Sequence, residues 1–429
     1  MPVFTSSIEL SDDYPTIEPS LKLNFARSRS LDPRITFTRA SVGTYVGRDG
    51  LIKTAGEDEA RFDHDPLTLE SLGLLTEESR SNSLTYSQPT SAASFGSSGT
   101  FTYNAATAPN GATEAFRITH NGSSGNSNWR ATRSITFGAD SMVLSVWAKG
   151  DGGNNYFVWS FQGLGGAIVR AGFKLEGDGE TSIITNGNGG HTLQIEKYPD
   201  GWYRCIIIAN TQSSGGTTQF LYTVSAYSEH SSISGGSVLL WGFQLESGAF
   251  ATSYIPTSGS AVTRAADTAK ITGTNFTDFY NNQESTIVCN FTQNAPTSSS
   301  VSGNERLYSF RKDSGADTRI DYVTYNAYHP YIAVDGSAVA NLSGFTHLYG
   351  GLESKTAVRV KENDFAVAFN GTIESTDSSG TWPPTSNNII EVFIGSQSTN
   401  TNNLNGHIKQ FSYYTKALPN AQLQSLTQQ

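Results

Sequence analysis

The sequence predicts an all-β protein with two β-sandwich (jelly-roll) domains in tandem behind an N-terminal arm and a small hairpin segment. The 429 residues include 42 Gly, 19 Tyr and 23 Phe, and only 15 % are charged, against roughly 25 % in an average soluble protein. Short runs that alternate apolar and polar residues recur between Gly, Pro, Asn and Asp turns, as half-buried strands require. The chain is too long for one hydrophobic core, so more than one domain is expected.

The first segment is expected to cover residues 1–85 and to combine the arm with a small hairpin segment. Residues 1 to about 25 are polar, contain three prolines and show no hydrophobic period. This is typical of an arm that stays disordered or packs on a neighbour. Residues 35–39 then alternate apolar residues with threonines and predict a strand. The turn Arg48-Asp49-Gly50 lies between two apolar pairs and predicts a short hairpin.

The second segment, residues 86–256, is expected to be a jelly roll of seven or eight short strands. Its last strand ends at Gly248, and the following residues up to Asp267 have no hydrophobic period, which indicates an extended connector. Trp147, Trp202 and Trp241 lie inside alternating runs and are expected in the core. The strands predicted before the last one cover residues 141–149, 156–162, 167–175, 192–198, 201–208 and 219–227.

The third segment, residues 257–429, is expected to be a second sandwich with a short C-terminal helix. Leu418, Leu423 and Leu426 share one helical stripe, and Pro419 stands at its start. The turn at residues 361–364 predicts a hairpin. The strands predicted here cover residues 285–292, 306–311, 319–325, 357–360, 364–370, 391–394 and 408–414.

Charge and composition disfavour several classes of partner. The formal net charge is −10, and no long run of Lys or Arg is present, so a nucleic-acid partner is not expected. No apolar run approaches the roughly 20 residues of a membrane span, and no signal peptide is recognisable, so membrane insertion is not expected either. Cys205 and Cys289 lie in strand-like runs far apart and are expected to be small buried residues without a disulfide.

Several blocks of sequence resemble bacteriophage tail and virion surface proteins. Residues 32–41 read Asp-Pro-Arg-Ile-Thr-Phe-Thr-Arg-Ala-Ser, and residues 61–66 and 72–82 read Arg-Phe-Asp-His-Asp-Pro and Leu-Gly-Leu-Leu-Thr-Glu-Glu-Ser-Arg-Ser-Asn. Together they resemble the segment that precedes carbohydrate-binding-module-like domains in such proteins, and the resemblance implies that residues 1–85 form a virion-attachment segment. Two further stretches resemble parts of such a domain. Residues 200–204 resemble a strand that is common inside it. Its closing strand and connector resemble Trp241, Gly242, Gln244, Leu245, Glu246, Gly248 and residues 251–257 and 263–267.

The C-terminal segment resembles a concanavalin-A-like or laminin-G-like sandwich. The resembling residues are 358–360 leading into 365–371, 394–395, and 404–409 leading to Tyr413 and Tyr414. Phage proteins that carry the N-terminal blocks often end in this way. The two resemblances imply a lectin-like virion protein.

Sugar binding requires an exposed aromatic ring to stack on and a few amides or carboxylates to bond the hydroxyls. Trp129 and Trp382 lie in polar loops and are the candidate stacking residues. Tyr328 and His329 belong to an aromatic and polar run that could line a groove, although a loop that packs on its own sheet or on another subunit fits equally well. For either tryptophan, an ordinary half-buried surface position is the more common case.

Two acidic stretches are considered as metal sites. In Asp63-His64-Asp65, neighbouring residues of an extended chain point to opposite faces, so a structural turn is favoured over a metal site. Residues 313–317 contain two aspartates around a glycine, and calcium is possible there by analogy with lectin sandwiches. Two carboxylates fall short of the roughly six to eight oxygens that calcium takes, so a solvated turn is favoured.

No catalytic motif is recognisable, and the protein is not expected to be an enzyme. A strand with acids at i and i+2, as in jelly-roll glucanases, is missing, because residues 57–59 lie in a turn and residues 176–178 in a loop. Nucleophile elbow, phosphate loop and zinc-protease motifs are absent. Distant residues could still converge, so a glycan depolymerase remains an alternative.

The resulting hypothesis is a phage virion protein, such as a tail fibre or adsorption component, that binds host surface polysaccharide through its sandwiches. It would assemble in the host cytoplasm, contact other virion proteins and form a homotrimer, so that repeated weak sugar contacts add up. The rival is a purely structural capsid-decoration or baseplate subunit.

Overall fold

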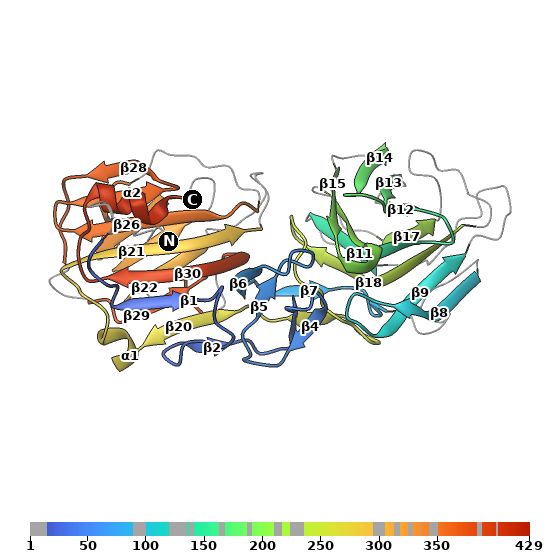
Figure 1. Cartoon of the computed structure of the whole chain (residues 1–429), viewed down its shortest axis with the longest axis horizontal. Coiled ribbons are helices and arrows are strands. Elements are labelled where there is room, and N and C mark those ends of the chain that lie inside the picture. Colours follow the sequence, from blue (N-terminus) through green and yellow to red (C-terminus); the bar gives the residue numbers. More distant parts are fainter. Residues whose placement is uncertain are drawn as a thin grey trace, which may run out of the picture. The chain divides into compact units, whose positions relative to one another are not determined.

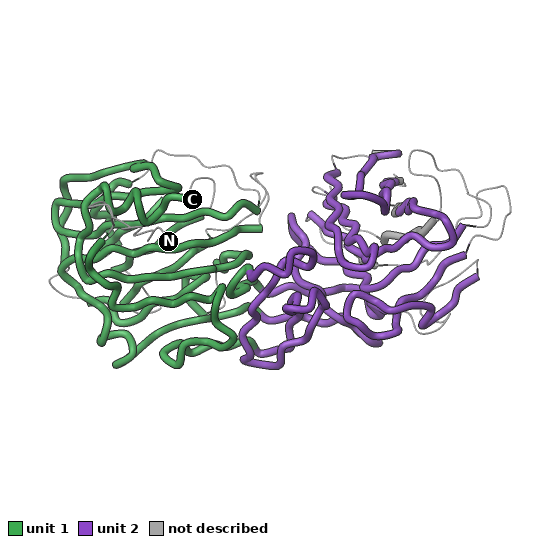
Figure 2. Tube along the Cα trace, viewed as in Figure 1, with its two compact units in different colours: residues 1–39, 72–78, 266–429 green, residues 40–71, 79–265 purple. Residues whose placement is uncertain are grey.

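The computed structural model describes residues 15–88, 100–119, 135–136, 141–162, 168–186, 191–209, 217–223, 236–294, 305–312, 318–324, 329–334, 336–342, 351–383, 388–399 and 402–429. The chain forms two compact units, coloured separately in Figure 2. Unit 1 comprises residues 1–39, 72–78 and 266–429, and unit 2 comprises residues 40–71 and 79–265. Both units are built from antiparallel sheets, which confirms the all-β fold class (Figure 1).

The N-terminal residues are distributed between the two units, whereas the sequence analysis grouped residues 1–85 as one segment. Strand β1 (Leu21–Asn24) pairs with the C-terminal strand β30 (Gly406–Tyr414), with Leu21 opposite Tyr413. Strand β2 (Thr36–Thr38) pairs with β20 (Thr268–Thr272). Residues 40–71 and 79–85 belong to unit 2. The described part of the predicted arm is therefore an integral strand of the C-terminal sandwich.

Unit 1 is a sandwich of two sheets. The first sheet has the order β28–β27–β26–β21–β30, and β1 and β6 pair with opposite ends of the free edge of β30. The second has the order β2–β20–β29–β22–β23–β24–β25. The remaining strands are β6 (Ser71–Thr76), β21 (Glu284–Gln293), β22 (Arg306–Arg311), β23 (Arg319–Val323), β24 (His329–Val334), β25 (Ser337–Ala340), β26 (Ser354–Lys361), β27 (Phe365–Phe369), β28 (Thr372–Asp377) and β29 (Glu391–Ile394).

Aromatic rings fill the space between the two sheets of unit 1. Tyr308 and Phe310 on β22 face Phe411 and Tyr413 on β30, with ring centroids 5.5 to 6.2 Å apart. Because β22 and β30 belong to different sheets, these contacts show that the sheets pack face to face. The short helix α1 (Thr274–Thr277) adds the buried Phe276 to this layer.

The second helix, α2 (Asn420–Thr427), covers part of the outer face of the first sheet. Leu418, Leu423 and Leu426 pack against the outward-facing Ala357 and Ala366, among others. The short alanines leave room for the helix on the sheet, and the predicted terminal helix is confirmed. Leu423 and Leu426 lie on the helix, whereas Leu418 precedes its first residue and joins the same cluster from outside the helix. The two helices that the structure describes, of four and eight residues, are far shorter than a membrane span.

Unit 2 is a second sandwich. Its sheets have the orders β15–β16–β11–β18–β9–β8 and β10–β17–β12–β13–β14, and two small pairs, β3–β4 and β7–β19, lie beside them. The strands are β3 (Gly43–Val46), β4 (Ile52–Ala55), β5 (Phe62–His64), β7 (Arg80–Asn82), β8 (Thr100–Thr107), β9 (Thr113–Thr119), β10 (Ile135–Thr136), β11 (Met142–Asp151), β12 (Tyr156–Gln162), β13 (Ile168–Lys174), β14 (Glu180–Asn186), β15 (His191–Lys197), β16 (Trp202–Ala209), β17 (Thr217–Thr223), β18 (Ser237–Ser247) and β19 (Val262–Arg264). A 3-10 turn at Pro199–Gly201 joins β15 to β16.

The central strands β16, β11 and β18 of the large sheet of unit 2 are buried on both faces. One face meets the other sheet in a core that includes Leu144, Phe157 and Trp159. On the opposite face, Trp147 and Trp241 pack against Tyr254, with ring centroids 4.6 to 5.7 Å apart. The three strand tryptophans predicted to be core, at 147, 202 and 241, are each at most 2 % exposed, which confirms that prediction.

The stretch after Gly248 does not leave unit 2 at once, as the predicted connector would. Tyr254 is 4 % exposed, and its carbonyl accepts a hydrogen bond of 2.6 Å from the Thr44 hydroxyl. The Gln244 side chain accepts the N–H of Ile255 at 2.6 Å, and Arg204 donates to the Thr252 carbonyl at 2.7 Å. Polar side chains on the outer face of the sheet thus hold this segment against it.

The blocks that carry the family resemblance meet in buried polar contacts within each unit. In unit 1, Arg39 and Asp267 form an ion pair of 3.1 Å with both side chains 0 % exposed, and Asp267 also accepts the N–H of Glu77 at 2.9 Å. In unit 2, Asn82 donates to the carbonyls of Phe243 and Ile255 at 3.0 and 2.9 Å. Buried polar groups need such partners, so Arg39 and Asp267 stabilise the fold of unit 1, and Asn82 stabilises that of unit 2.

Cys205 and Cys289 are both free and buried, as the sequence predicts. Burial raises the pKa of each thiol well above its usual value, so each stays in the protonated form. The two residues pack as small apolar side chains.

Candidate functional site

The structure describes two of the four predicted sugar-binding residues, His329 and Trp382. Trp129 and Tyr328 lie outside the described residues, so their role stays a prediction. His329 begins strand β24 and is half-buried. Trp382 is only 2 % exposed, so the expectation of an exposed stacking ring is wrong for this residue. Burial of a large apolar ring is favourable, and the indole is therefore held inside unit 1 although its flanking sequence is polar.

The acidic stretch Asp63-His64-Asp65 has a structural role, as predicted, but it is not a turn: Asp63 and His64 end strand β5, and Asp65 precedes the turn at residues 66–68. The carboxylate of Asp63 accepts the N–H of Val46 at 2.6 Å, and that of Asp65 accepts two N–H groups of its own loop, from Leu67 and Thr68. These are capping contacts. Among the residues that the structure describes, no three His, Cys, Asp or Glu side chains are grouped so that they could hold a metal ion. The possible calcium stretch at residues 313–317 lies outside the described residues.

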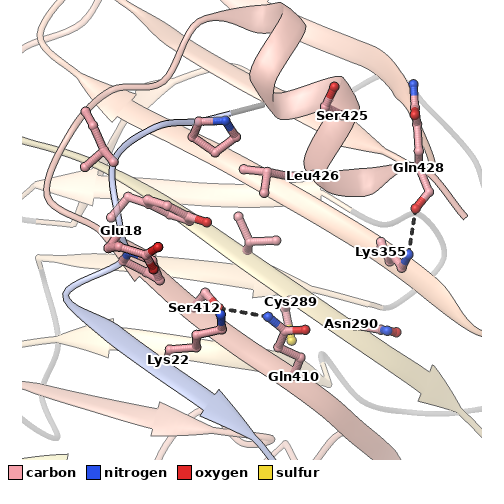
Figure 3. Close-up of a pocket in the computed structure, with 15 residues that line it drawn as sticks. Glu18, Lys22, Cys289, Asn290, Lys355, Gln410, Ser412, Ser425, Leu426 and Gln428 are labelled. Carbon is pink, nitrogen blue, oxygen red and sulfur yellow. Dashed lines mark hydrogen bonds between the residues drawn. The ribbon is translucent and has the colours of Figure 1, made fainter. Parts of the chain in front are cut away.

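A cavity of about 360 Å³ lies on the outer face of the first sheet of unit 1 (Figure 3). Its floor is formed by strands β21, β26 and β30, one wall by helix α2, and the other by residues 15–19 with the start of β1. A volume of this size is at the lower end of what small-molecule sites occupy. The residues that line it are Pro15, Ile17, Glu18, Pro19, Lys22, Val288, Cys289, Asn290, Lys355, Gln410, Ser412, Tyr414, Ser425, Leu426 and Gln428.

The floor of the cavity consists of two rows of side chains that run across the strands. In the first row, Asn290 is paired with Lys355 on one side and with Gln410 on the other. In the second row, Ser412 is paired with Val288 and with Lys22. Residues two apart on a strand point to the same face, so both rows project from the sheet in the same direction. Antiparallel register therefore brings together residues that are up to 390 positions apart in the chain.

Hydrogen-bonding groups in the cavity are only partly satisfied. The side-chain N–H of Asn290 donates to Glu353 at 2.7 Å, but its buried carbonyl oxygen has no hydrogen-bond partner among the residues that the structure describes. Gln410 donates to the Ser412 hydroxyl over a long 3.3 Å. Lys355 donates to the carbonyl of Gln428 at 2.6 Å, which joins the floor to the end of α2. A buried acceptor without a partner is costly, so a ligand hydroxyl that donates to Asn290 would be favourable.

The upper part of the cavity is apolar. Val288, Tyr414 and Leu426 belong to the cluster beneath α2, and two prolines of the opposite wall face the same space. A sugar ring has C–H groups and hydroxyls on different sides. It is therefore complementary to a protein surface in which apolar side chains lie next to amides and hydroxyls.

A carboxylate stands beside the floor. Glu353 accepts hydrogen bonds from Asn290 and, at 2.5 Å, from the ammonium group of Lys409. Burial raises the pKa of Glu353, but the hydrogen bonds from Lys409 and Asn290 outweigh it, so the net effect is a lowered pKa. Glu353 is therefore ionised at neutral pH, and it holds the amide of Asn290 in a fixed orientation.

The sequence analysis named none of the residues that line this cavity as a candidate for ligand binding. Its polar lining residues are of common types and lie on separate strands, helix α2 and the N-terminal segment, and only the register of the sheet brings those of the floor together. The alternation of outward-facing polar residues on residues 408–414 was visible, but it is the same signal that any solvated sheet face gives.

Comparison with known proteins finds similarity at the level of solved structures. No protein-family model matches the chain, and no curated protein matches it in sequence. Domain 4 of an extracellular arabinanase from Geobacillus stearothermophilus, solved with arabinotriose, is 15 % identical over 42 % of this chain and 81 % of that one, with a TM-score of 0.30. The sialidase of Trypanosoma rangeli is 12 % identical over 73 % of this chain and 60 % of its own length, with a TM-score of 0.29. Domains LG4-5 of the mouse laminin alpha1 chain are 8 % identical over 69 % and 89 %, with a TM-score of 0.22.

These findings correct the expectation that the protein is not an enzyme. Glycoside hydrolases, an arabinanase and sialidases, are among the similar structures, so that expectation is withdrawn. At this level of similarity no catalytic residue can be transferred to the chain. The sandwich fold of each unit follows from its own sheet topology.

Proposed function

We propose that the protein recognises glycans through the cavity on the outer face of the first sheet of unit 1. The observation that carries this proposal is the floor of the cavity, where Asn290, Gln410 and Ser412 form cross-strand rows beside apolar walls. Amides and hydroxyls can both donate and accept, as sugar hydroxyls do, so a small number of them fixes the orientation of a ring.

Removal of the amides from the floor is expected to weaken glycan binding. Asn290→Ala and Gln410→Ala should each raise the dissociation constant about tenfold, which corresponds to about 1.4 kcal/mol for a lost hydrogen bond. Binding is measured by calorimetry on the oligosaccharide that gives the strongest signal on a glycan array. The matched control is Gln283→Ala, because Gln283 is exposed and lies outside the cavity. Equal affinities for all four proteins would refute the assignment of the site.

Hydrolysis of the bound glycan is the second candidate. Its supporting observation is a pair of carboxylates near the cavity, since Glu18 lines it and Glu353 bonds the lining residue Asn290. Glycosidases use two carboxyl groups about 5 to 10 Å apart. Incubation of the intact protein with the bound oligosaccharide distinguishes the two functions. Release of reducing ends by the parent protein, abolished in both Glu18→Gln and Glu353→Gln, would support hydrolysis. Binding without any release would support glycan recognition without hydrolysis.

We further propose that this recognition serves adsorption of a virion to its host, as a tail fibre or related component. Support comes from the sequence blocks that resemble phage tail proteins. In this proposal the protein is a homotrimer that contacts other virion proteins, and its cavities bind host surface polysaccharide with avidity. A solution mass near three times the chain mass of 46.1 kDa, and antibody label on the tails of particles, are the expected results. Label confined to the capsid would favour the capsid-decoration alternative.

A further inference from the structure

We infer that the cavity selects acidic glycans, whose carboxylates pair with the lysine side chains at its two ends. This inference rests on the proposed glycan recognition and names its ligand class. The chain as a whole has 38 acidic and 28 basic residues, and a formal net charge of −10. The cavity reverses this balance, because Lys22 and Lys355 line it together with one carboxylate, that of Glu18.

Both ammonium groups have capacity for a ligand. Lys22 is exposed on β1, and its ammonium group forms no hydrogen bond or ion pair with another described residue. Lys355 donates one hydrogen bond, to the Gln428 carbonyl at 2.6 Å, and an ammonium group has three hydrogens. Unlike the nearby Lys409, which is paired with Glu353 at 2.5 Å, neither lysine forms an ion pair among the described residues.

The two lysines stand at opposite ends of the polar floor, as Figure 3 shows. Lys355 is on β26 and Lys22 on β1, and strands β21 and β30 lie between them. Adjacent strands are about 4.8 Å apart, so three intervals separate the two backbones by about 14 Å. Asn290, Gln410 and Ser412 fill this interval. A ligand therefore meets hydroxyl-binding groups in the centre and a positive charge at each end.

The carboxylate of Glu18 also lines the cavity and opposes the binding of acidic glycans. This carboxylate is exposed at the rim beside the N-terminal wall, and it repels an acidic ligand. The two lysines outweigh it, and the charge of the neighbouring Glu353 is balanced by its ion pair with Lys409, so the local charge remains positive. Removal of the Glu18 charge should therefore strengthen the binding of acidic glycans, while removal of either lysine charge should weaken it.

The test uses the full chain and a panel of oligosaccharides that are each presented as the free uronic acid and as its methyl ester. Esterification removes the charge and keeps the sugar backbone. The acid is expected to bind at least tenfold more tightly at low salt, and the difference should shrink as the salt concentration rises. Lys22→Gln and Lys355→Gln should each reduce binding of the acid about fivefold and leave binding of the ester unchanged. Glu18→Gln should increase binding of the acid about threefold.

Lys416→Gln is the matched control, because Lys416 is an exposed lysine of unit 1 that pairs with Glu284 outside the cavity. It should bind both forms like the parent protein. Equal binding of acid and ester, still weakened by Asn290→Ala, would overturn the acidic preference and leave glycan recognition standing. If no member of the panel binds, both the inference and the proposed function fail.

Discussion

Replacement of Asp267 by alanine is expected to lower the free energy of unfolding of unit 1 by about 3 to 5 kcal/mol. Asp267 and Arg39 form an ion pair of 3.1 Å in which both side chains are 0 % exposed. Loss of the carboxylate would leave the guanidinium group buried without its counter-charge, and the N–H of Glu77 would lose its acceptor. The loss should be measured by denaturant-dependent hydrogen exchange, which reports on each unit separately.

An exposed ion pair of the same unit provides the control. Lys416 pairs with Glu284 at 2.9 Å, but its side chain is 58 % exposed, so Lys416→Ala should change the stability by less than about 1 kcal/mol. The double variant Arg39→Met, Asp267→Leu should recover much of the loss, because it removes both charges together. If Asp267→Ala costs no more than Lys416→Ala, the buried pair does not stabilise the unit in the way argued above.

Replacement of Trp147 by alanine is expected to destabilise unit 2 by about 3 to 5 kcal/mol. The indole is 1 % exposed and packs edge-on against Tyr198, Trp241 and Tyr254, and the guanidinium of Arg204 lies 4.6 Å from its ring. Alanine would leave a large cavity between the sheet and the segment that covers it. Hydrogen exchange of the β11 and β18 amides, compared with those of unit 1, measures the effect.

Two further substitutions test the packing around the Trp147 ring. Trp147→Phe keeps most of the apolar volume and should cost clearly less than alanine. Gly242→Ala should also destabilise the unit, because Gly242 has φ of 67° and a Cβ atom there would lie 2.8 Å from the Trp147 ring. A stability loss confined to unit 1, or a loss below about 1 kcal/mol for Trp147→Ala, would contradict this account.

The strands that the sequence predicted best are those with a buried and strongly apolar face. Residues 156–162, 306–311 and 391–394 match β12, β22 and β29 at both ends. Strands β8 and β14 went unpredicted, because β8 is rich in Thr, Asn and Ala with half-exposed residues throughout, and both lie at sheet edges. Edge strands gain little from burial, so their sequences carry a weak hydrophobic period.

The sequence by itself determined the fold class, most of the central strands, the terminal helix and the buried state of three tryptophans, because each depends on local alternation of apolar and polar residues. It did not determine that residues 15–24 complete the C-terminal sandwich, that Trp382 is buried, or that Asn290, Lys355 and Gln410 share one row. Those features depend on which strands pair and in what register, and pairing between residues hundreds of positions apart is decided by packing of the whole unit.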